Sequence, residues 1–248
     1  MRLSGKVALI TGAARGVGLA VAKRFVKEGA TVIMTDINND MLQAAAKGLT
    51  EHAFALNVAD EAAWKARVEW IEATFGTLDV LFNNAAILRA GYIDQISLEQ
   101  WRSIQTVNAD SIFMATQQCL PLLAQGGGSI INMSSSSALM GMPEFCAYTA
   151  SKAAVRSLTM STAVLCKQRA NGVRCNSIHP DGINTDMVRE IVADMPQDGK
   201  KDYSRSVPFV CQPEDVANLV LFLASDESRH LNGAALSIDN TATIHPPY

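Results

Sequence analysis

The sequence predicts one α/β domain of the doubly wound class, with seven parallel strands in a single sheet and helices on both of its faces. Short apolar runs rich in β-branched residues alternate with longer segments of helical spacing along the whole chain. Helical crossovers between such strands make the sheet parallel and cover both faces. No linker, repeat or low-complexity segment divides the 248 residues, so we expect a single domain over 1–248.

The first half of the chain alternates four predicted strands with three helices. The first strand, at 6–11, is a short apolar run that ends at Gly12. In the helix at 17–28 apolar residues recur on one face, and Gly29 ends it. The other strands are the apolar runs 31–36, 52–58 and 78–85, and the helices between them are 39–49, which begins near Asn39, and 60–75, with Asp60 as N-cap.

The second half continues the alternation with longer helices. A helix is predicted from about Leu98 to Leu123, and glycines separate it from a strand at 129–134. The next helix runs from 147 to about Ala170 and leads into a strand at 172–180. The rest of the chain is predicted as a loop with short helices at 181–210, of which 186–210 covers the substrate, a helix at 213–225 with Pro213 in its first turn, and a strand at 234–239.

Composition and charge exclude several classes of function. The net charge is −3 and lysine and arginine are scattered, so no nucleic-acid or anionic membrane partner is expected. No apolar run approaches the ~18 residues that cross a bilayer, and the N-terminal apolar stretch is too short for a signal peptide. The five cysteines form no CxxC or Cys/His cluster, so we expect neither a disulfide framework nor a metal site, and the predicted location is cytoplasmic.

A glycine-rich turn joins the first predicted strand to the first helix. Its glycines, Gly12, Gly16 and Gly18, have the spacing GxxxGxG, which differs from the GxGxxG of the common dinucleotide fingerprint. The physical argument is the same, because glycines let backbone N–H groups approach a pyrophosphate at the positive end of a helix. A tight turn without a ligand is the structural alternative.

Asp36 indicates which cofactor this turn would serve. It ends the second predicted strand about 20 residues beyond the turn, where a carboxylate accepts hydrogen bonds from the adenosine ribose and repels the additional phosphate of NADP. Arg15 argues the other way, because a guanidinium beside the ribose can bind that phosphate. Ile37 adds no second positive charge, and we therefore predict NAD.

Tyr148 and Lys152 lie four residues apart in a predicted helix and hence on the same face, one turn apart. The pKa of a free tyrosine is about 10, which is high for a base at neutral pH. A nearby ammonium, together with the positive nicotinamide ring of the cofactor, favours the phenolate and lowers that pKa, which suits removal of a proton from an alcohol. For either residue alone, an ordinary structural role is the alternative.

Three motifs occur in order along the chain: TGxxxGxG at 11–18, a relative of NNAG at 83–86, and YxxxK at 148–152. With them, the chain resembles the short-chain dehydrogenase/reductase family over nearly its whole length. Ser135, thirteen residues before the tyrosine, and Asn108, in the long middle helix, match the rest of the family's catalytic set. The resemblance implies a Rossmann fold and hydride transfer between a nicotinamide cofactor and a secondary alcohol or ketone.

The resemblance also implies a role for each catalytic residue. Ser135 would bind the substrate oxygen and hold it against the Tyr148 phenol. Lys152 would bind the nicotinamide ribose in addition to lowering the pKa of the phenol. Asn108 would hold a water beside Lys152.

The same resemblance assigns residues to the cofactor. Asp181, Asn57 and Ala86 depart from the family pattern, in which glycine, aspartate and glycine are usual. The implied cofactor contacts are Gly12, Arg15, Gly16, Val17, Gly18, Asp36, Ile37, Asn57, Val58, Asn84, Ala85, Ala86, Tyr148, Lys152, Pro180, Ile183 and Thr185.

The residues expected around the substrate are mainly apolar. No arginine fork for a carboxylate or phosphate accompanies them, so a bulky apolar alcohol or ketone is the predicted substrate. Segments 177–183 and 219–228 resemble the bacterial 3β/17β-hydroxysteroid dehydrogenases within the family. The predicted substrate contacts are Ser135, Leu88, Met142, Phe145 and Met187, with Leu139, Val188 and Ile191 close to them.

Two other functions stay open at this point. One is an NADPH-dependent ketoreductase of a carrier-bound or thioester-bound substrate, which Arg15 supports. The other is a regulator that binds NAD without turnover, against which the complete catalytic set argues. The resemblance further implies a homotetramer that pairs through the helices at 98–123 and 147–170. Separately, we expect the tail at 244–248 to pack on a neighbouring subunit near its crevice.

Overall fold

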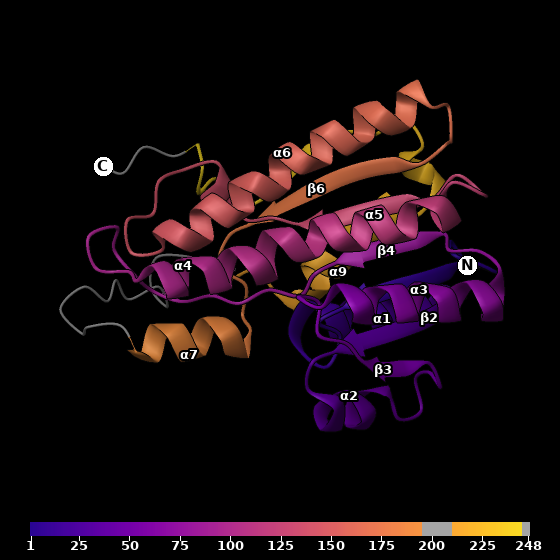
Figure 1. Cartoon of the computed structure of the whole chain (residues 1–248), viewed down its shortest axis with the longest axis horizontal. Coiled ribbons are helices and arrows are strands. Elements are labelled where there is room, and N and C mark those ends of the chain that lie inside the picture. The colour runs from indigo at the N-terminus through magenta and orange to yellow at the C-terminus, as the bar shows by residue number, and fades with distance from the viewer. Residues whose placement is uncertain (195–209, 245–248) are drawn as a thin grey trace.

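The computed structural model describes residues 1–194 and 210–244. In this part of the chain seven strands form one parallel sheet in the order β3-β2-β1-β4-β5-β6-β7, with helices on both faces, which confirms the predicted fold class (Figure 1). The strands are β1 (Val7–Thr11), β2 (Thr31–Asp36), β3 (Ala53–Ala55), β4 (Val80–Asn83), β5 (Ser129–Met133), β6 (Arg174–Pro180) and β7 (Ala235–Ile238). The helices are α1 (Gly16–Lys27), α2 (Asn39–Ala46), α3 (Glu61–Phe75), α4 (Leu98–Gln105), α5 (Ser111–Leu123), α6 (Cys146–Gln168), α7 (Asp186–Asp194) and α9 (Pro213–Ala224).

The strand order reverses beside β1. From β1 the chain moves outward to β3, and it then returns to form β4 on the other side of β1. The connections leave these two neighbouring strands in opposite directions, and a crevice opens at their carboxyl ends. The two strand ends are tied together there, because the backbone N–H groups of Asn84 and Ala85 donate to the Thr11 hydroxyl at 2.9 and 3.0 Å.

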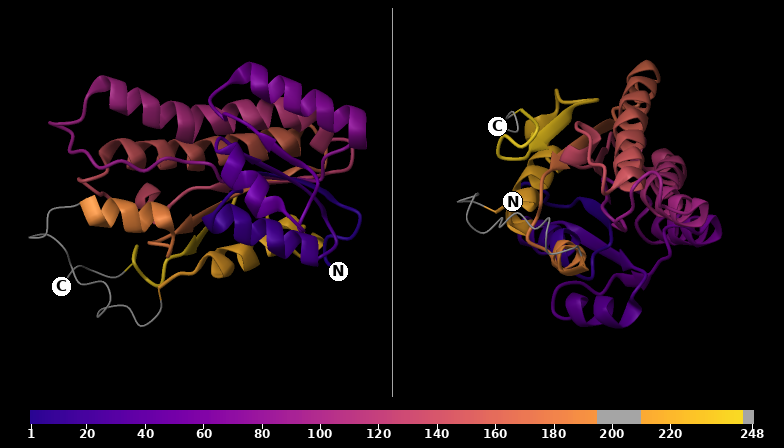
Figure 2. Two further views of the ribbon diagram at one scale, coloured as in Figure 1. Left: turned by 90° about the horizontal axis from the view of Figure 1, so that it is seen from below. Right: turned by 90° about the vertical axis from the view of Figure 1, so that its left-hand side faces the viewer.

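Both faces of the sheet are buried. Alternate residues of β1 point to opposite faces, so Ala8 and Ile10 belong to the apolar cluster formed with α1 and α9. Leu9 belongs to the second cluster, which includes Trp64 of α3 and Leu122 of α5. The two helical layers are visible on either side of the sheet in Figure 2. Burial on both faces explains why the strands read as nearly continuous apolar runs in the sequence.

The helix starts are close to their predicted positions. Asp60 caps α3, and its side chain accepts from the N–H groups of Ala62 and Ala63. Asn38 caps α2 by accepting from Met41, one residue before the expected start. These short polar side chains satisfy backbone donors that have no partner inside the helix.

The long helix predicted at 98–123 is not uniform. A π-helical turn at Thr106–Asp110 lies between α4 and α5. This wider turn brings Asn108 into the interior, where the side chain bonds the backbone of Ile87 and is fully buried. Turns of this kind are rare and occur often at functional sites.

Two other predicted segments differ from the structure. The strand expected at 52–58 pairs with β2 only over Ala53–Ala55, because Asn57 forms a turn in which its side chain accepts from Ala59. Of the predicted substrate cover at 186–210, α7 accounts for the first part, and 195–209 lie outside the described residues. Most of the predicted contact by the tail at 244–248 also lies outside them, since the description ends at residue 244.

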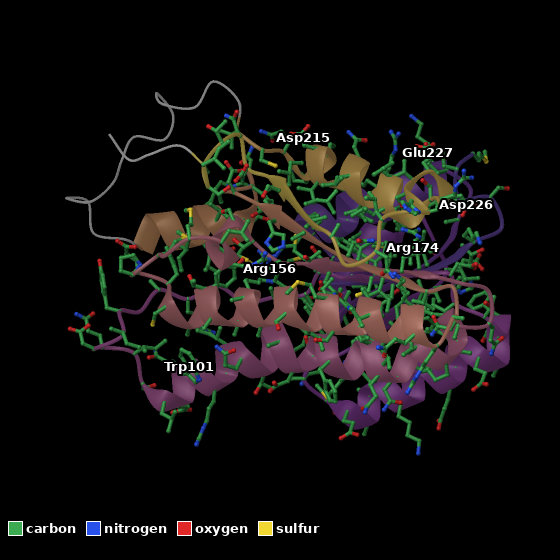
Figure 3. The ribbon with its side chains drawn as sticks, turned by 90° about the horizontal axis from the view of Figure 1, so that it is seen from above. Trp101, Arg156, Arg174, Asp215, Asp226 and Glu227 are labelled. Atoms are coloured by element: carbon green, nitrogen blue, oxygen red, sulfur yellow. The ribbon has the colours of Figure 1, made fainter. Side chains whose placement is uncertain are left out.

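Charged side chains gather at the amino-terminal end of the sheet. Lys6 pairs with Asp79 at 3.0 Å, and Arg174 donates to backbone carbonyls at the end of α9. Figure 3 shows Arg174 with Asp226 and Glu227 at this end, away from α7. Their contacts fasten loops to the sheet at the end opposite the crevice. Within 1–194 and 210–244, no helix combines the length and the apolar character needed to span a membrane.

Candidate active site

A cavity of about 380 Å³ opens at the carboxyl ends of the strands, where the strand order reverses. It runs from the β1–α1 turn and the end of β2 to the start of α6 and the segment after β6. Most residues predicted from the sequence meet in its wall. They are Gly12, Arg15, Gly16, Val17, Asp36, Ile37, Asn57, Val58, Asn84, Ala85, Ala86, Leu88, Ser135, Tyr148, Lys152, Pro180, Ile183, Thr185 and Met187.

The glycine-rich turn has the geometry of an anion site. Gly12 has φ +63°, and a Cβ there would lie 2.9 Å from the Ala85 Cα, so only glycine lets the turn lie against the β4 loop. Arg15 is the N-cap of α1 but makes no side-chain capping bond, and the first turn of α1 carries no acidic residue. The N-terminus of this helix thus lies at the cavity with no side chain bonded to its N–H groups, an arrangement that suits a pyrophosphate.

Gly18, a predicted cofactor contact, lies behind the glycine-rich turn, against Gly12. In the described part of the chain it is not in the cavity wall. A Cβ at this position would fall 2.1 Å from the Gly12 carbonyl oxygen. Gly18 therefore allows α1 to pack against the turn, and its contribution to the cofactor site is indirect.

Asp36 is fixed at the end of the cavity that the glycine-rich turn forms. One carboxylate oxygen accepts from the Ala14 N–H at 3.1 Å and the other from the Asn38 N–H at 3.0 Å. Both bonds hold the carboxylate beside the glycine-rich turn. A carboxylate in this position accepts ribose hydroxyls and repels a phosphate.

Arg15, the residue that argued for NADP, is engaged by acidic side chains of α7. Its guanidinium donates to Glu190 at 3.1 Å and lies 3.8 Å from a carboxylate oxygen of Asp186. The sequence pattern did not predict these pairs, because the partners are about 170 residues away along the chain.

The catalytic pair predicted from the YxxxK motif lies in the cavity wall. Tyr148 and Lys152 belong to α6, and the Lys152 Nζ is 5.6 Å from the centroid of the phenol ring. The Lys152 ammonium donates to the Met133 carbonyl at 2.8 Å, at the end of β5. The lysine is almost fully buried, whereas Tyr148 keeps one side open to the cavity.

Burial shifts the pKa values of both groups in the direction of their neutral forms. It raises the pKa of Tyr148 to about 12, although a hydrogen bond from Ser135 acts in the opposite direction. It lowers the pKa of Lys152 to about 7. In the protein chain by itself, the lysine does not bring the pKa of the phenol below its ordinary value. The low-polarity surroundings penalise the ammonium as well as the phenolate, so the attraction between them does not offset their burial.

Ser135 is held by the short helical turn that follows β5 and by β6. Its hydroxyl accepts from the Ser137 N–H at 3.1 Å, and its carbonyl is 3.0 Å from the Nδ1 of His179. Because a carbonyl can only accept, Nδ1 carries the proton, and Nε2 accepts from the Ser177 hydroxyl at 2.9 Å. His179 is fully buried, and burial lowers its pKa, which favours this neutral form. No local sequence pattern predicts this contact, because Ser135 and His179 are 44 residues apart along the chain.

Asn108 supports the site from behind. Its amide accepts from the Ile87 N–H at 2.8 Å and donates to the Ile87 carbonyl at 2.9 Å and to the Ser151 hydroxyl at 3.1 Å. In the described part of the chain Asn108 is absent from the cavity wall, whereas Ile87 is part of it. The visible contribution of the asparagine is thus to hold the loop after β4.

The predicted substrate residues divide into two groups. Leu88, Met187 and Val188 lie in the cavity wall. Among the described residues that wall does not include Met142, Phe145, Leu139 or Ile191. Phe145 is buried beside Gly91, with which it forms an isolated bridge, and Leu139 is partly exposed. No group of three or more His, Cys, Asp or Glu side chains within the described ranges could hold a metal ion.

Comparison with known proteins agrees with this geometry. Residues 12–243 match the family described as enoyl-(acyl carrier protein) reductase. The chain is 41% identical to the 3-beta-hydroxysteroid dehydrogenase of Comamonas testosteroni, across 97% of this chain and 96% of that protein. It is 39% identical to the 3-alpha-(or 20-beta)-hydroxysteroid dehydrogenase of Mycobacterium bovis, across 96% and 89%.

A further relative carries a different activity in its name. The 3-oxoacyl-[acyl-carrier-protein] reductase FabG of Thermotoga maritima is 38% identical, across 98% of this chain and all of that protein. The matches extend over the glycine-rich turn, the tyrosine–lysine pair and the segment after β6 alike. This chain therefore belongs to the short-chain dehydrogenase/reductase family and is an oxidoreductase that uses a nicotinamide cofactor.

Proposed function

We propose that the protein transfers a hydride between NAD and a bulky apolar secondary alcohol or ketone, a hydroxysteroid or a compound of similar shape. The observation that carries the proposal is that one cavity contains Asp36 at one end and the Ser135–Tyr148–Lys152 group at the other. The apolar side chains Leu88, Met187 and Val188 near the second group suit a hydrocarbon skeleton. The names of two relatives point to steroids as well.

The chemistry assigned to the chain is a proton transfer beside a hydride transfer. The Ser135 hydroxyl binds the substrate oxygen, and the ionised oxygen of Tyr148 takes the proton of the substrate hydroxyl. An oxidised nicotinamide held beside Tyr148 and Lys152 would supply the hydride acceptor and a positive charge. The Lys152 ammonium is a second positive charge, and together the two favour the phenolate against the burial that raises the pKa of Tyr148. Asn108 and His179 keep this geometry by bonding Ile87 and Ser135.

The choice of NAD rests on charge at the adenosine end. The Asp36 carboxylate is fixed by two backbone N–H groups and would repel a phosphate on the ribose. The guanidinium of Arg15, which could have bound that phosphate, is engaged by Glu190 and Asp186. These two contacts together favour NAD over NADP.

The test is an assay of the purified protein with epiandrosterone, a 3β-hydroxysteroid, and either NAD or NADP. We expect formation of reduced cofactor mainly with NAD. Tyr148→Phe should lower kcat by about 10²–10⁴-fold, because it removes the general base, and should retain measurable NADH binding by fluorescence. Tyr92→Phe, which changes an exposed tyrosine in a loop, is the matched control and should keep the rate.

A second candidate function is NADPH-dependent reduction of a ketone on a thioester or carrier. Its support is the likeness to the Thermotoga maritima reductase and the presence of Arg15 in the cavity wall. Faster reduction of acetoacetyl-CoA with NADPH than of any steroid ketone with NADH would favour it. NADH binding without turnover of a broad panel of alcohols and ketones would instead indicate a regulator.

We also propose a homotetramer and a cytoplasmic location. The outward faces of α5 and α6 expose Phe113, Met160 and Val164, which suits contact with another copy of the chain. All five cysteines are free thiols, which suits a reducing compartment.

A further inference from the structure

Arg15 connects the glycine-rich turn to α7. Its guanidinium donates to Glu190 at 3.1 Å, and the same nitrogen lies 3.8 Å from Asp186. Asp186 also pairs with Arg189 at 2.6 Å, within the same helix. The first turns of α7 thus carry a small ion-pair network with one member outside the helix, and that member is Arg15.

The start of α7 lies close to the turn that Arg15 belongs to. Thr185 is the residue before α7, and a Cβ built on Gly16 would lie 3.4 Å from its Cγ2. Thr185, Asp186, Met187 and Val188 all line the cavity. Figure 1 shows α7 beyond the carboxyl ends of the strands, joined to the sheet through the segment that follows β6. The position of this helix therefore decides where part of the apolar wall of the cavity lies.

We propose that Arg15 is a positioning residue for α7: its ion pairs with Glu190 and Asp186 hold the helix across the glycine-rich turn and thereby fix Met187 and Val188 against the substrate. The inference rests on the proposed function for the class of substrate. It gives Arg15 a role toward the alcohol or ketone, although the residue lies at the nucleotide end of the cavity.

We expect the ion pairs of Arg15 to have a modest effect on substrate affinity. The side chains of Arg15, Asp186 and Glu190 are 44%, 50% and 64% exposed, so water and salt screen their attraction. Exposed pairs of this kind change an equilibrium by about two- to fivefold each. Such a change alters substrate affinity and leaves the catalytic group in place.

The first variant to test is Glu190→Gln, which keeps the size of the side chain and removes its charge. With epiandrosterone and saturating NAD, we expect KM for the steroid to rise about two- to fivefold while kcat stays the same. The same rise should appear in the wild type when the salt concentration increases from about 0.05 to 0.5 M. Glu214→Gln, an exposed acid at the start of α9, is the matched control and should behave as the wild type.

Arg15→Met should have the same effect on KM for the steroid, and the double variant should not exceed the larger single effect. Such non-additivity identifies a direct partnership. If the two effects multiply, or if Glu190→Gln leaves KM unchanged at low salt, the proposed positioning role is wrong. Glu190→Asp, which keeps the charge on a shorter side chain, should recover part of the loss.

Hydrogen exchange of the α7 backbone tests the inference without any substrate. Amides of α7 (Asp186–Asp194) should exchange about two- to fivefold faster in Glu190→Gln than in the wild type, while those of α9 stay unchanged. If epiandrosterone is not oxidised, the proposed substrate class fails but this measurement still tests the ion pairs. Unchanged exchange together with normal turnover would reject the inference and leave the proposed function intact.

Discussion

The buried position of Lys152 serves the proposed chemistry but lowers the stability of the folded protein. Its ammonium is almost fully buried, and in the described part of the chain its hydrogen bond is to the Met133 carbonyl. Burial lowers its pKa from 10.5 to about 7, so the folded protein holds the lysine's proton less tightly than the unfolded chain does. A surface lysine would avoid this cost, and the cost is a sign that the position serves chemistry.

This buried lysine predicts a pH-dependent gain in stability for Lys152→Met. Between pH 7 and 10.5 the unfolded chain binds more protons than the folded one, so the contribution of Lys152 makes the folded state more stable as pH rises. The methionine variant lacks this unfavourable contribution. It should be more stable than the wild type at pH 7, and the advantage should shrink toward pH 10.5, as measured by urea unfolding at several pH values.

Comparing Lys152→Met with the wild type cancels the contributions that other titratable groups make to the pH dependence of stability. Burial raises the pKa of Cys119 to about 12 and raises that of Cys175, and these thiols act in the opposite sense above their ordinary pKa. Both proteins contain them, so the difference isolates Lys152. Lys167→Met, an exposed position on the same helix, should give no pH-dependent difference. A constant difference between Lys152→Met and the wild type across this range would contradict the prediction.

For single residues, the sequence predicts which side chains lie close together but not how burial shifts their pKa values. The spacing of Tyr148 and Lys152 correctly gives one face of one helix, since a helical period is a local property. The direction of their pKa shifts depends on burial by distant segments, and no local pattern reports it. The same limit applies to His179 of β6, whose contact with Ser135 joins residues that are 44 apart along the chain.

Among the elements, the β1–α1 turn is the most constrained by its surroundings. Gly12 and Gly48 both have positive φ, +63° and +72°. A Cβ on Gly12 would meet the backbone of Ala85 at 2.9 Å, whereas nothing lies within 4 Å of one on Gly48. The pair therefore separates backbone strain from loss of space.

We predict that Gly12→Ala and Gly48→Ala both lose about 1–2 kcal/mol of unfolding free energy through the unfavourable φ, measured in urea. Only Gly12→Ala should also weaken NADH binding, by about tenfold or more, which corresponds to about 1.4 kcal/mol. Its methyl group must displace either the turn or the β4 loop, and both line the cavity. Equal NADH affinity in the two variants, measured by fluorescence titration, would contradict this account of the turn.

Elements were predictable where one local signal dominates. Asp60 marks a helix start because its side chain satisfies nearby N–H groups, and the apolar runs mark strands buried on both faces. The π-helical turn at Thr106–Asp110 leaves no such signal in the sequence, because it accompanies the contact of Asn108 with Ile87, which lies on another segment. The early end of β3 likewise comes from the turn around Asn57.

At the scale of the whole molecule, the parallel sheet explains how one site draws on the entire chain. All carboxyl ends of its strands lie at one edge, so residues from Gly12 to Val188 can line a single cavity. At the amino-terminal ends of the strands, charged side chains such as Arg174 bind the neighbouring helix end and loops. Within the described residues, the exposed faces of α5 and α6 form no part of the cavity wall, so they remain available for contacts with other copies of the chain.

If the protein is a homotetramer that pairs through α5 and α6, a charged residue on the exposed faces of these helices should weaken its assembly. Phe113 on α5 and Met160 and Val164 on α6 are 49%, 41% and 56% exposed, and the last two lie one helical turn apart. Figures 1 and 2 show the two helices side by side on one face of the molecule. Such a set of apolar side chains is stabilised by burial against another copy.

Light scattering after size-exclusion chromatography should give four times the 26.6 kDa chain mass for the wild type and a smaller assembly for Phe113→Asp or Val164→Asp. Ile93→Asp is the control, because Ile93 is 77% exposed but lies in the loop before α4, and this variant should keep the wild-type mass. Circular dichroism then separates dissociation from unfolding, since a folded but smaller species is expected. A wild type of single-chain mass would contradict the tetramer, and an unchanged mass in both aspartate variants would contradict the assignment of the interface to α5 and α6.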